Sequence, residues 1–157
     1  MKIRSRRGIV RRLPIPILTL LIVASVLFGM GRFLVLPFSS PRPDDLGVID
    51  GHLYPCGDHV NCVSGEISYV GSYNEARDRL LSIIEATEGT TLITHSAHYI
   101  YVEFRSGVWG FMDDVEFYFP HFRRNLHYRS SSRLGRNDHE ANRARIDTII
   151  EAFLSDD

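Results

Sequence analysis

An uncharged apolar stretch near the N-terminus divides this chain into two unlike parts. Residues 13–31, LPIPILTLLIVASVLFGMG, contain no charged side chain, and about 20 apolar residues are enough for an α-helix to cross a bilayer. Pro14 and Pro16 lie at the start of the stretch, where a missing backbone N–H costs least. The pattern predicts one transmembrane helix at residues 13–31.

The basic residues around this stretch predict its orientation. Residues 1–12 contain six Lys and Arg, whereas the far side offers only Arg32 and Arg42 nearby. Because cytoplasmic flanks are enriched in Lys and Arg, we expect a basic cytoplasmic tail at residues 1–12 and a single-pass protein of the cell membrane with its C-terminal part outside the cytoplasm. The alternative is a secretory signal cleaved near residues 29–31, but the apolar run is long for a signal peptide.

The rest of the chain is acidic. Residues 32–50 combine Pro, Ser and acidic residues with little periodicity and predict an extended linker before a domain at residues 51–157. All 19 acidic residues follow residue 33, where 11 arginines leave a net charge of −8. Such an excess repels phosphate backbones, so we expect no nucleic-acid partner. The expected partners are the membrane, through the N-terminal helix, and a membrane protein; the oligomeric state is left open.

Two segments of the domain have the pattern of amphipathic helices. Residues 72–89 open with Ser72 and Glu75 in capping-box spacing and end in Gly89, a residue suited to the C′ position. A second helix is predicted from the N-cap Asp138 onward. Its apolar face consists of Ile146, Ile149, Ile150 and Phe153.

The segment between these helices predicts strands. Four runs are rich in β-branched and aromatic residues: TTLIT, HYIYVEFRS, VWGFMDDVEFYF and LHYRSSS. Consecutive strands flanked by helices favour an α+β fold, a two-layer sandwich of a three- to four-stranded antiparallel sheet with both helices on one face.

Polar residues should meet where the last two strands end. If Phe119 pairs with Leu126, Glu116 falls opposite Arg129. Asp114 then falls opposite Ser131 on that same face, and Asp113 falls opposite Ser132 on the other. The segment 129–145, RSSSRLGRNDHEANRAR, would then fold back on the aspartates. The predicted polar cluster consists of Asp113, Asp114, Glu116, Arg129, Ser130, Ser132, Arg133, Asp138, Asn142, Arg143 and Arg145.

Three interpretations of this cluster are open. We favour a structural brace, because carboxylates and arginines this close pair with one another. The second is a ligand pocket in which an arginine and the helix start at Asp138 bind a carboxylate or phosphate. The third, catalysis or metal binding by Asp113, Asp114 and Glu116, is disfavoured because adjacent strand residues point to opposite faces. We expect no cofactor.

The two cysteines, Cys56 and Cys62, lie in one short loop with His59 between them. A zinc site of His52, Cys56, His59 and Cys62 is a weak match to the usual ligand spacing. Outside the cytoplasm, two cysteines this close more often form a disulfide. We favour the disulfide over the metal, and free thiols remain the third alternative in a reducing compartment.

Three ordered motifs, NCVSG, GFMDDVEFYF and RSSSRLGRNDHEANRAR, resemble those of the family catalogued as domain of unknown function 1499. The resemblance covers residues 53–154. The matching positions are Cys56, Asn61, Cys62, Val63, Ser64, Asp113, Asp114, Glu116, Arg129, Ser130, Ser132, Arg133, Gly135, Asp138, Asn142, Arg143 and Arg145. The departures are Gly57, Val60, Gly65 and residues 139–141. The resemblance implies a small domain that often follows an N-terminal anchor or export signal, and it does not indicate a biochemical activity.

The sequence therefore predicts a membrane-anchored extracytoplasmic domain of unknown activity. No serine has a His and Asp partner at a spacing that supports nucleophilic catalysis, which favours a non-enzymatic binding or assembly module for a membrane or envelope partner. The alternative is an anion- or ligand-binding sensor, or an enzyme, that uses Asp113, Asp114 and Arg133.

Overall fold

The computed structural model describes residues 15–35, 40–106, 110–134 and 139–155. Contacts separate the chain into two compact units, Met1–Pro37 and Phe38–Asp157. Helix α1, Ile15–Val35, belongs to the first unit and contains most of the stretch predicted to span a membrane. Among the described residues, no helix combines the length and the hydropathy required to cross a bilayer. The transmembrane helix predicted at residues 13–31 is thus not confirmed.

The second unit is built on a five-stranded antiparallel sheet with the strand order β3-β7-β6-β5-β4. Its strands are β3 (Cys62–Ser68), β4 (Thr90–His95), β5 (Tyr99–Arg105), β6 (Met112–Tyr118) and β7 (Asn125–Ser132). The strands β4 to β7 follow one another as the predicted meander, and β3 pairs with β7 at the far edge.

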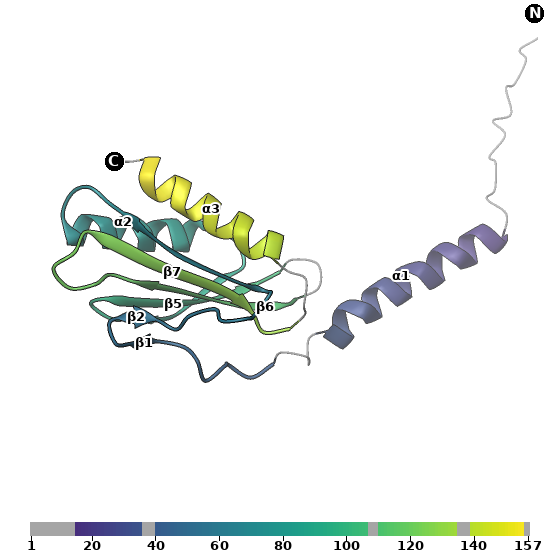
Figure 1. Cartoon of the computed structure of the whole chain (residues 1–157). Helices are drawn as coiled ribbons and strands as arrows, with labels where there is room; N and C mark the ends of the chain where they lie inside the picture. The colour runs from purple at the N-terminus through teal and green to yellow at the C-terminus, as the bar shows by residue number, and fades with distance from the viewer. Residues whose placement is uncertain (1–14, 36–39, 107–109, 135–138, 156–157) are drawn as a thin grey trace, which may run out of the picture. The chain divides into compact units, whose positions relative to one another are not determined.

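Two helices cover one face of this sheet, as Figure 1 shows. They are α2 (Tyr73–Ala86) and α3 (His139–Ser155). Ser72 and Glu75 form the predicted capping box, but α2 ends at the C-cap Thr87, two residues before Gly89. The predicted N-cap Asp138 lies outside the described residues.

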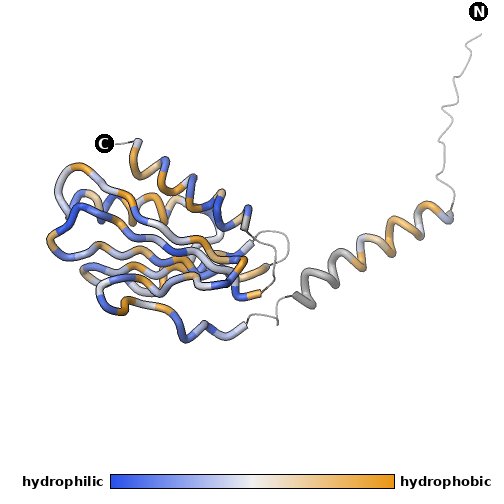
Figure 2. The backbone as a smooth tube through the Cα atoms, in the orientation of Figure 1, coloured by the Kyte–Doolittle hydropathy of each residue, from blue (hydrophilic) through white to orange (hydrophobic). Residues whose placement is uncertain are grey.

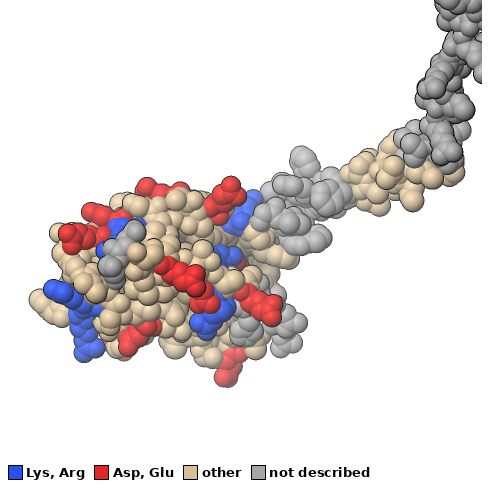
Figure 3. All heavy atoms as spheres, turned by 90° about the horizontal axis from the view of Figure 1, so that it is seen from above, with Lys and Arg blue, Asp and Glu red and all other residues tan. Residues whose placement is uncertain are grey.

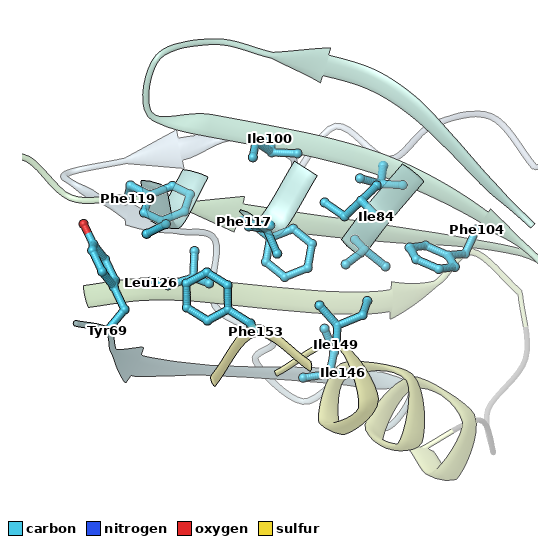
Figure 4. Close-up of a cluster of buried hydrophobic side chains, with 14 of the residues drawn as sticks. Tyr69, Ile84, Ile100, Phe104, Phe117, Phe119, Leu126, Ile146, Ile149 and Phe153 are labelled. Carbon is cyan, nitrogen blue, oxygen red and sulfur yellow. The ribbon is translucent and has the colours of Figure 1, made fainter. Parts of the chain in front are cut away.

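The hydrophobic core lies between the two layers. Figure 4 shows Phe117, Phe119, Leu126 and Phe153 meeting there, and all four are 0% exposed. The buried side of α2 consists of Ala76, Leu80 and Ile84, and that of α3 consists of Ile146, Ile149 and Phe153. Hydrophilic and hydrophobic residues are mixed along the strands and helices of this unit (Figure 2).

The opposite face of the sheet is covered by residues 40–53, which we call the strap. It ends in a hairpin of β1 (Val48–Ile49) and β2 (His52–Leu53), drawn on the side away from the helices in Figure 1. Asp50 and Gly51 both have positive φ, 51° and 77°, as a two-residue turn of this hand requires. Residues 40–50, which the sequence predicts as part of a linker, thus contact the sheet.

The sheet has one strand more than the upper limit of the prediction. The missed strand is β3, whose sequence CVSGEIS contains few β-branched residues and a glycine. The Tyr128 hydroxyl lies where a Cβ at position 65 would be, so a larger residue there would have to displace this side chain. The ring of Tyr128, on β7, supplies the packing that β3 itself lacks.

Candidate functional site

The pairing of β6 with β7 determines where the predicted polar residues lie. Glu116 is opposite Arg129, Asp114 is opposite Ser131 and Asp113 is opposite Ser132, which is the predicted register. Because side chains alternate along a strand, Asp113 faces the helices, whereas Asp114 and Glu116 face the strap. The structure therefore divides the predicted cluster into two networks, one on each face of the sheet.

The network on the helix side is centred on Asn142, which is 0% exposed. Its Nδ2 donates to the Asn61 carbonyl and to Ser132 Oγ, both at 3.0 Å. Its Oδ1 accepts from Ser130 Oγ at 2.8 Å and from Arg145 at 2.9 Å. Asn142 thus ties α3 to β7 and to the cysteine loop.

The same network contains one buried ion pair. Arg145 donates to Asp113 Oδ2 at 2.7 Å, and Ser132 Oγ donates to Asp113 Oδ1 at 2.6 Å. The Arg145 guanidinium also lies over the Phe104 ring, 4.7 Å from its centroid. Asp113 is 1% exposed, so these partners replace the water that its charge would otherwise need.

The network on the strap side has Arg133 at one end. Its Nε lies 2.9 Å from Asp114 Oδ2, and its NH2 group lies 2.7 Å from Asp114 Oδ1, a bidentate pair. The NH2 group also donates to Glu103 and to the Tyr101 hydroxyl, and NH1 donates to the Ser40 carbonyl. The hydrogen bond to Asp114 raises the pKa of Arg133 above its ordinary value, against the effect of burial.

Arg129 and Glu116 form the second ion pair on this face. Arg129 NH1 donates to Glu116 Oε2 at 2.9 Å and to the Asp45 carbonyl at 3.0 Å. Its NH2 donates to Asp45 Oδ2 at 2.6 Å. Glu116 also accepts from the Gly47 backbone N–H at 2.6 Å and from the Tyr99 hydroxyl at 2.7 Å. The strap therefore closes over the pair and supplies part of its hydrogen bonding.

Two tyrosines of β5 donate to these carboxylates. Tyr99 donates to Glu116, and Tyr101 donates to Asp114. Burial, followed by these hydrogen bonds, raises the pKa of both hydroxyls well above the ordinary value. Both tyrosines therefore remain protonated donors throughout the physiological range.

A cleft of about 490 Å³ opens beside the strap-side network. We call it the polar cleft. Its walls come from the strap, the cysteine loop and the ends of β6 and β7. They consist of Pro43, Asp45, Asp58, His59, Val60, Asn61, Cys62, Asp114, Arg129, Ser131, Ser132 and Arg133.

One donor in the wall of the polar cleft has no acceptor in the part of the chain that the structure describes. Arg129 is 2% exposed, and its Nε–H makes no hydrogen bond among the described residues. A buried donor left unpaired costs about 1–3 kcal/mol. Arg129, which lines the cleft, therefore has one N–H whose hydrogen bond is not supplied by the described residues.

The cysteine loop forms the outer wall of the cleft and is closed by a disulfide. Cys56 and Cys62 are joined at an S–S distance of 2.06 Å, which confirms the favoured prediction. Because the two sulfur atoms are bonded to each other, the alternative zinc site of His52, Cys56, His59 and Cys62 is not formed. His52 instead stacks on His127 of β7, with ring centroids 5.5 Å apart.

The remaining predicted residues have different outcomes. Arg143 is exposed on α3 and contributes to neither network. Asp138 and its helix start lie outside the described residues. Because Asp113 and Arg133 lie on opposite sides of the sheet, the alternative site built from Asp113, Asp114 and Arg133 is not assembled.

Sequence reasoning missed several members of the strap-side network, among them Asp45, Tyr101 and Glu103. A signal for the last two was present, since both alternate with the apolar Ile100, Val102 and Phe104 on β5. Glu103 lies directly opposite Asp114, and facing carboxylates require a cation between them. Asp45 carried no such signal, because nothing periodic places the strap.

The pairing of Glu103 predicts a response to acid. Burial raises the pKa of Glu103, but hydrogen bonds and charges from Arg42 and Arg133 outweigh it and hold the pKa below its ordinary value. Glu103 therefore stabilises the fold fully above its unfolded pKa of about 4.3, and this contribution is lost as the pH falls through the lower folded value. We expect the stability difference between the wild type and Glu103→Gln to shrink from about pH 6 to about pH 3.

Chemical denaturation of both proteins over that range measures this difference. Glu88→Gln is the matched control, because Glu88 is exposed and has no ion pair among the described residues. A stability difference for Glu103→Gln that stays constant with pH would contradict the assignment.

Charged side chains elsewhere on the domain are mixed in sign. Figure 3 shows the face seen from above, where Arg side chains and Asp or Glu side chains are interspersed. This face has no continuous basic patch of the kind that binds a nucleic-acid backbone.

The fold and the two networks define a class of protein: a small two-layer α+β domain with ion pairs buried on both faces of its sheet. The chain belongs to the family described as protein of unknown function, DUF1499, whose model matches residues 52–153. The comparison with curated proteins gave no match.

Proposed function

We propose that this protein is a membrane-tethered binding module, and that the polar cleft is where it receives its partner. The proposal joins two parts of the chain, an N-terminal tether and a folded domain outside the cytoplasm. The supports are the apolar sequence before the domain and the unpaired donor in the cleft.

The tether rests on sequence. Residues 13–31 contain no charge and follow six basic residues. A cytoplasmic basic tail and an extracytoplasmic domain follow from the enrichment of Lys and Arg on the inner flank. Residues 15–35 are helical, which fits such a segment.

The observation that carries the binding role is the unpaired Nε–H of Arg129 in the wall of the polar cleft. A ligand that brings an acceptor to this donor would remove the cost of an unmet hydrogen bond. Ser131, which is 9% exposed, lines the same cleft and also carries a hydroxyl.

The charges around the cleft favour a polar acceptor without a strong charge of its own. Asp45 and Glu116 already neutralise Arg129, and Asp114 and Glu103 neutralise Arg133. An anion would meet these carboxylates as well as the arginines. A carbonyl or hydroxyl group, as on a peptide segment of a membrane or envelope protein, satisfies the donor without adding repulsion.

The same pairing favours binding over acid–base catalysis. A catalytic carboxylate must be able to exchange a proton near the working pH. Asp114 and Glu116 are 1% and 0% exposed and are each held by an arginine and a tyrosine. Both are therefore committed as acceptors within the fold.

The test blocks the mouth of the cleft without touching either network. Val60 lines the cleft and is 49% exposed, so Val60→Trp should fill the opening and leave the fold intact. The control is Val70→Trp, because Val70 is 65% exposed and does not line the cleft.

The measurement is the recovery of partner proteins with the tagged full-length chain from gently solubilised membranes. We expect proteins that accompany the wild type and Val70→Trp to be absent with Val60→Trp. Equal recovery with both tryptophan variants would remove the cleft from the proposal.

The tether has its own test. We expect the full-length chain to remain with membranes after alkaline extraction, and its domain to be cut by protease added to intact cells. Replacing Leu20 and Val23 by arginine should release the chain, because each charge at the centre of a span costs about 2.5–3.5 kcal/mol. Release of the wild type by alkali would contradict the tether.

A further inference from the structure

A second pocket lies at another end of the sheet, where the turn between β6 and β7 meets the start of α2. We call it the hairpin pocket, and its volume is about 410 Å³. Unlike the polar cleft, it has no acidic residue in its lining. The side chains that matter here are Arg123, Arg124, His98, His121 and Tyr73.

The two arginines of the turn form no ion pair among the described residues. Arg123 and Arg124 are exposed, and neither side chain forms an ion pair or hydrogen bond within the described part of the chain. The backbone of Arg124 is fixed, because its carbonyl accepts from the Tyr69 N–H at 3.0 Å. Glu75, at the start of α2, is occupied by the capping box at Ser72, and Asp50, which shares a neighbouring pocket with Arg123, forms no ion pair with it among the described residues. Two adjacent positive charges thus remain open to a ligand.

Tyr73 in the lining of this pocket has a buried hydroxyl without a partner among the described residues. Tyr73 packs its ring against His98 and Phe119, with centroids 5.1 and 5.5 Å away. Its Oη is buried and makes no hydrogen bond to any described residue. Because burial raises the pKa of Tyr73, the group stays a donor that an oxyanion can satisfy.

Two histidines also line the pocket. His98 and His121 have ring centroids only 3.7 Å apart. His98 Nδ1 lies 3.0 Å from the Phe119 carbonyl, which only accepts, so this nitrogen carries the hydrogen. The ring of His98 is thereby held in place beside the pocket.

The turn between β6 and β7 contains a residue in an unfavourable backbone conformation. Phe122 has a φ of 61°, a conformation that bulky residues rarely adopt, and its side chain is fully exposed. Backbone strain of this kind persists where surrounding structure enforces it and clusters at ligand sites. Here it places Arg123 and Arg124 together at the pocket and an aromatic ring at its rim.

We propose that the hairpin pocket binds a phosphate-class oxyanion, held by Arg123 and Arg124 with Tyr73 Oη as a further donor. Guanidinium groups match phosphate oxygens in bidentate fashion, and a divalent phosphate balances two arginines. The anion could belong to a soluble phosphate compound or to a lipid headgroup, which share this chemistry.

The test is calorimetric titration of the full-length chain with two soluble probes. These are inorganic phosphate and glycerophosphoglycerol, the deacylated headgroup of an anionic phospholipid. The variants are Arg123→Gln with Arg124→Gln, and Tyr73→Phe. The control is Arg105→Gln, since Arg105 is exposed and does not line the pocket. Melting temperatures verify that each variant is folded.

We expect the double variant to weaken binding by about tenfold or more, because charge-assisted hydrogen bonds are lost. Tyr73→Phe should weaken it severalfold, and Arg105→Gln should leave it unchanged. Tighter binding of inorganic phosphate identifies a soluble compound as the source, and tighter binding of glycerophosphoglycerol identifies a headgroup. Binding of neither probe, or equal binding by the double variant, overturns the proposal. Neither of these two results bears on the proposed role of the polar cleft, which has its own test.

Discussion

Replacing Arg133 by glutamine should lower the free energy of unfolding by about 3–5 kcal/mol, the usual loss when one member of a buried ion pair is removed. Asp114 is 1% exposed and would lose a bidentate partner, and Glu103 would lose one of its two cations. The amide of glutamine carries no charge to replace them. Urea denaturation of the purified chain measures the change.

A double-mutant cycle distinguishes the ion pair from general damage. Asp114→Asn combined with Arg133→Gln removes both charges, so the loss should be smaller than the sum of the two single losses. Arg143→Gln is the matched control, because Arg143 is exposed on α3, and it should change stability by no more than about 0.5 kcal/mol. An unchanged melting temperature for Arg133→Gln would show that the ion pairs of Arg133 do not stabilise the fold.

Truncating Asn142, on the helix side of the sheet, should also lower the free energy of unfolding, because it leaves buried polar groups without partners. Asn142→Ala removes two donated and two accepted hydrogen bonds at a site that is 0% exposed. Each buried partner left unsatisfied costs about 1–3 kcal/mol. Partial rearrangement of Ser130 and Ser132 leaves an expected loss of about 3 kcal/mol.

Asn142→Asp tests whether hydrogen-bond chemistry or volume matters. Aspartate has nearly the same shape, but its second oxygen would face the Asn61 carbonyl and bring a charge toward Asp113. We therefore expect Asn142→Asp to be destabilised as well. Asn74→Ala is the control, since Asn74 is exposed on α2. A stable aspartate variant would mean that packing alone holds this position.

Most of the sheet and both of its helices could be predicted from the sequence, because their patterns are local. The alternation on β5 and the capping box of α2 depend on residues a few positions apart. The β6–β7 register was predictable for the same reason, since a short turn fixes which residues face each other.

The missed parts depend on contacts between distant residues. β3 pairs with β7, whose residues lie 57 to 69 positions later in the sequence, and is held partly by Tyr128 over Gly65. The strap has no periodicity, and its position depends on Asp45 meeting Arg129 and Arg42 meeting Glu103. No local pattern marks such pairings.

The predicted register already separates Asp113 from Asp114, and the structure shows one network on each face of the sheet. Asp113 and Asp114 are neighbours in sequence, so the pleat sends them to opposite faces. Each aspartate therefore pairs with a different arginine. Arg145 of α3 pairs with Asp113 on the helix side, and Arg133 pairs with Asp114 on the strap side.

The strap has a consequence for the extent of the folding unit. The family match begins at residue 52, after every strap contact with the buried arginines and carboxylates. A fragment cut there would leave Arg129 with Glu116 alone and would remove the Ser40 carbonyl from Arg133. The smallest piece of this chain that keeps all of these strap contacts therefore begins no later than Ser40.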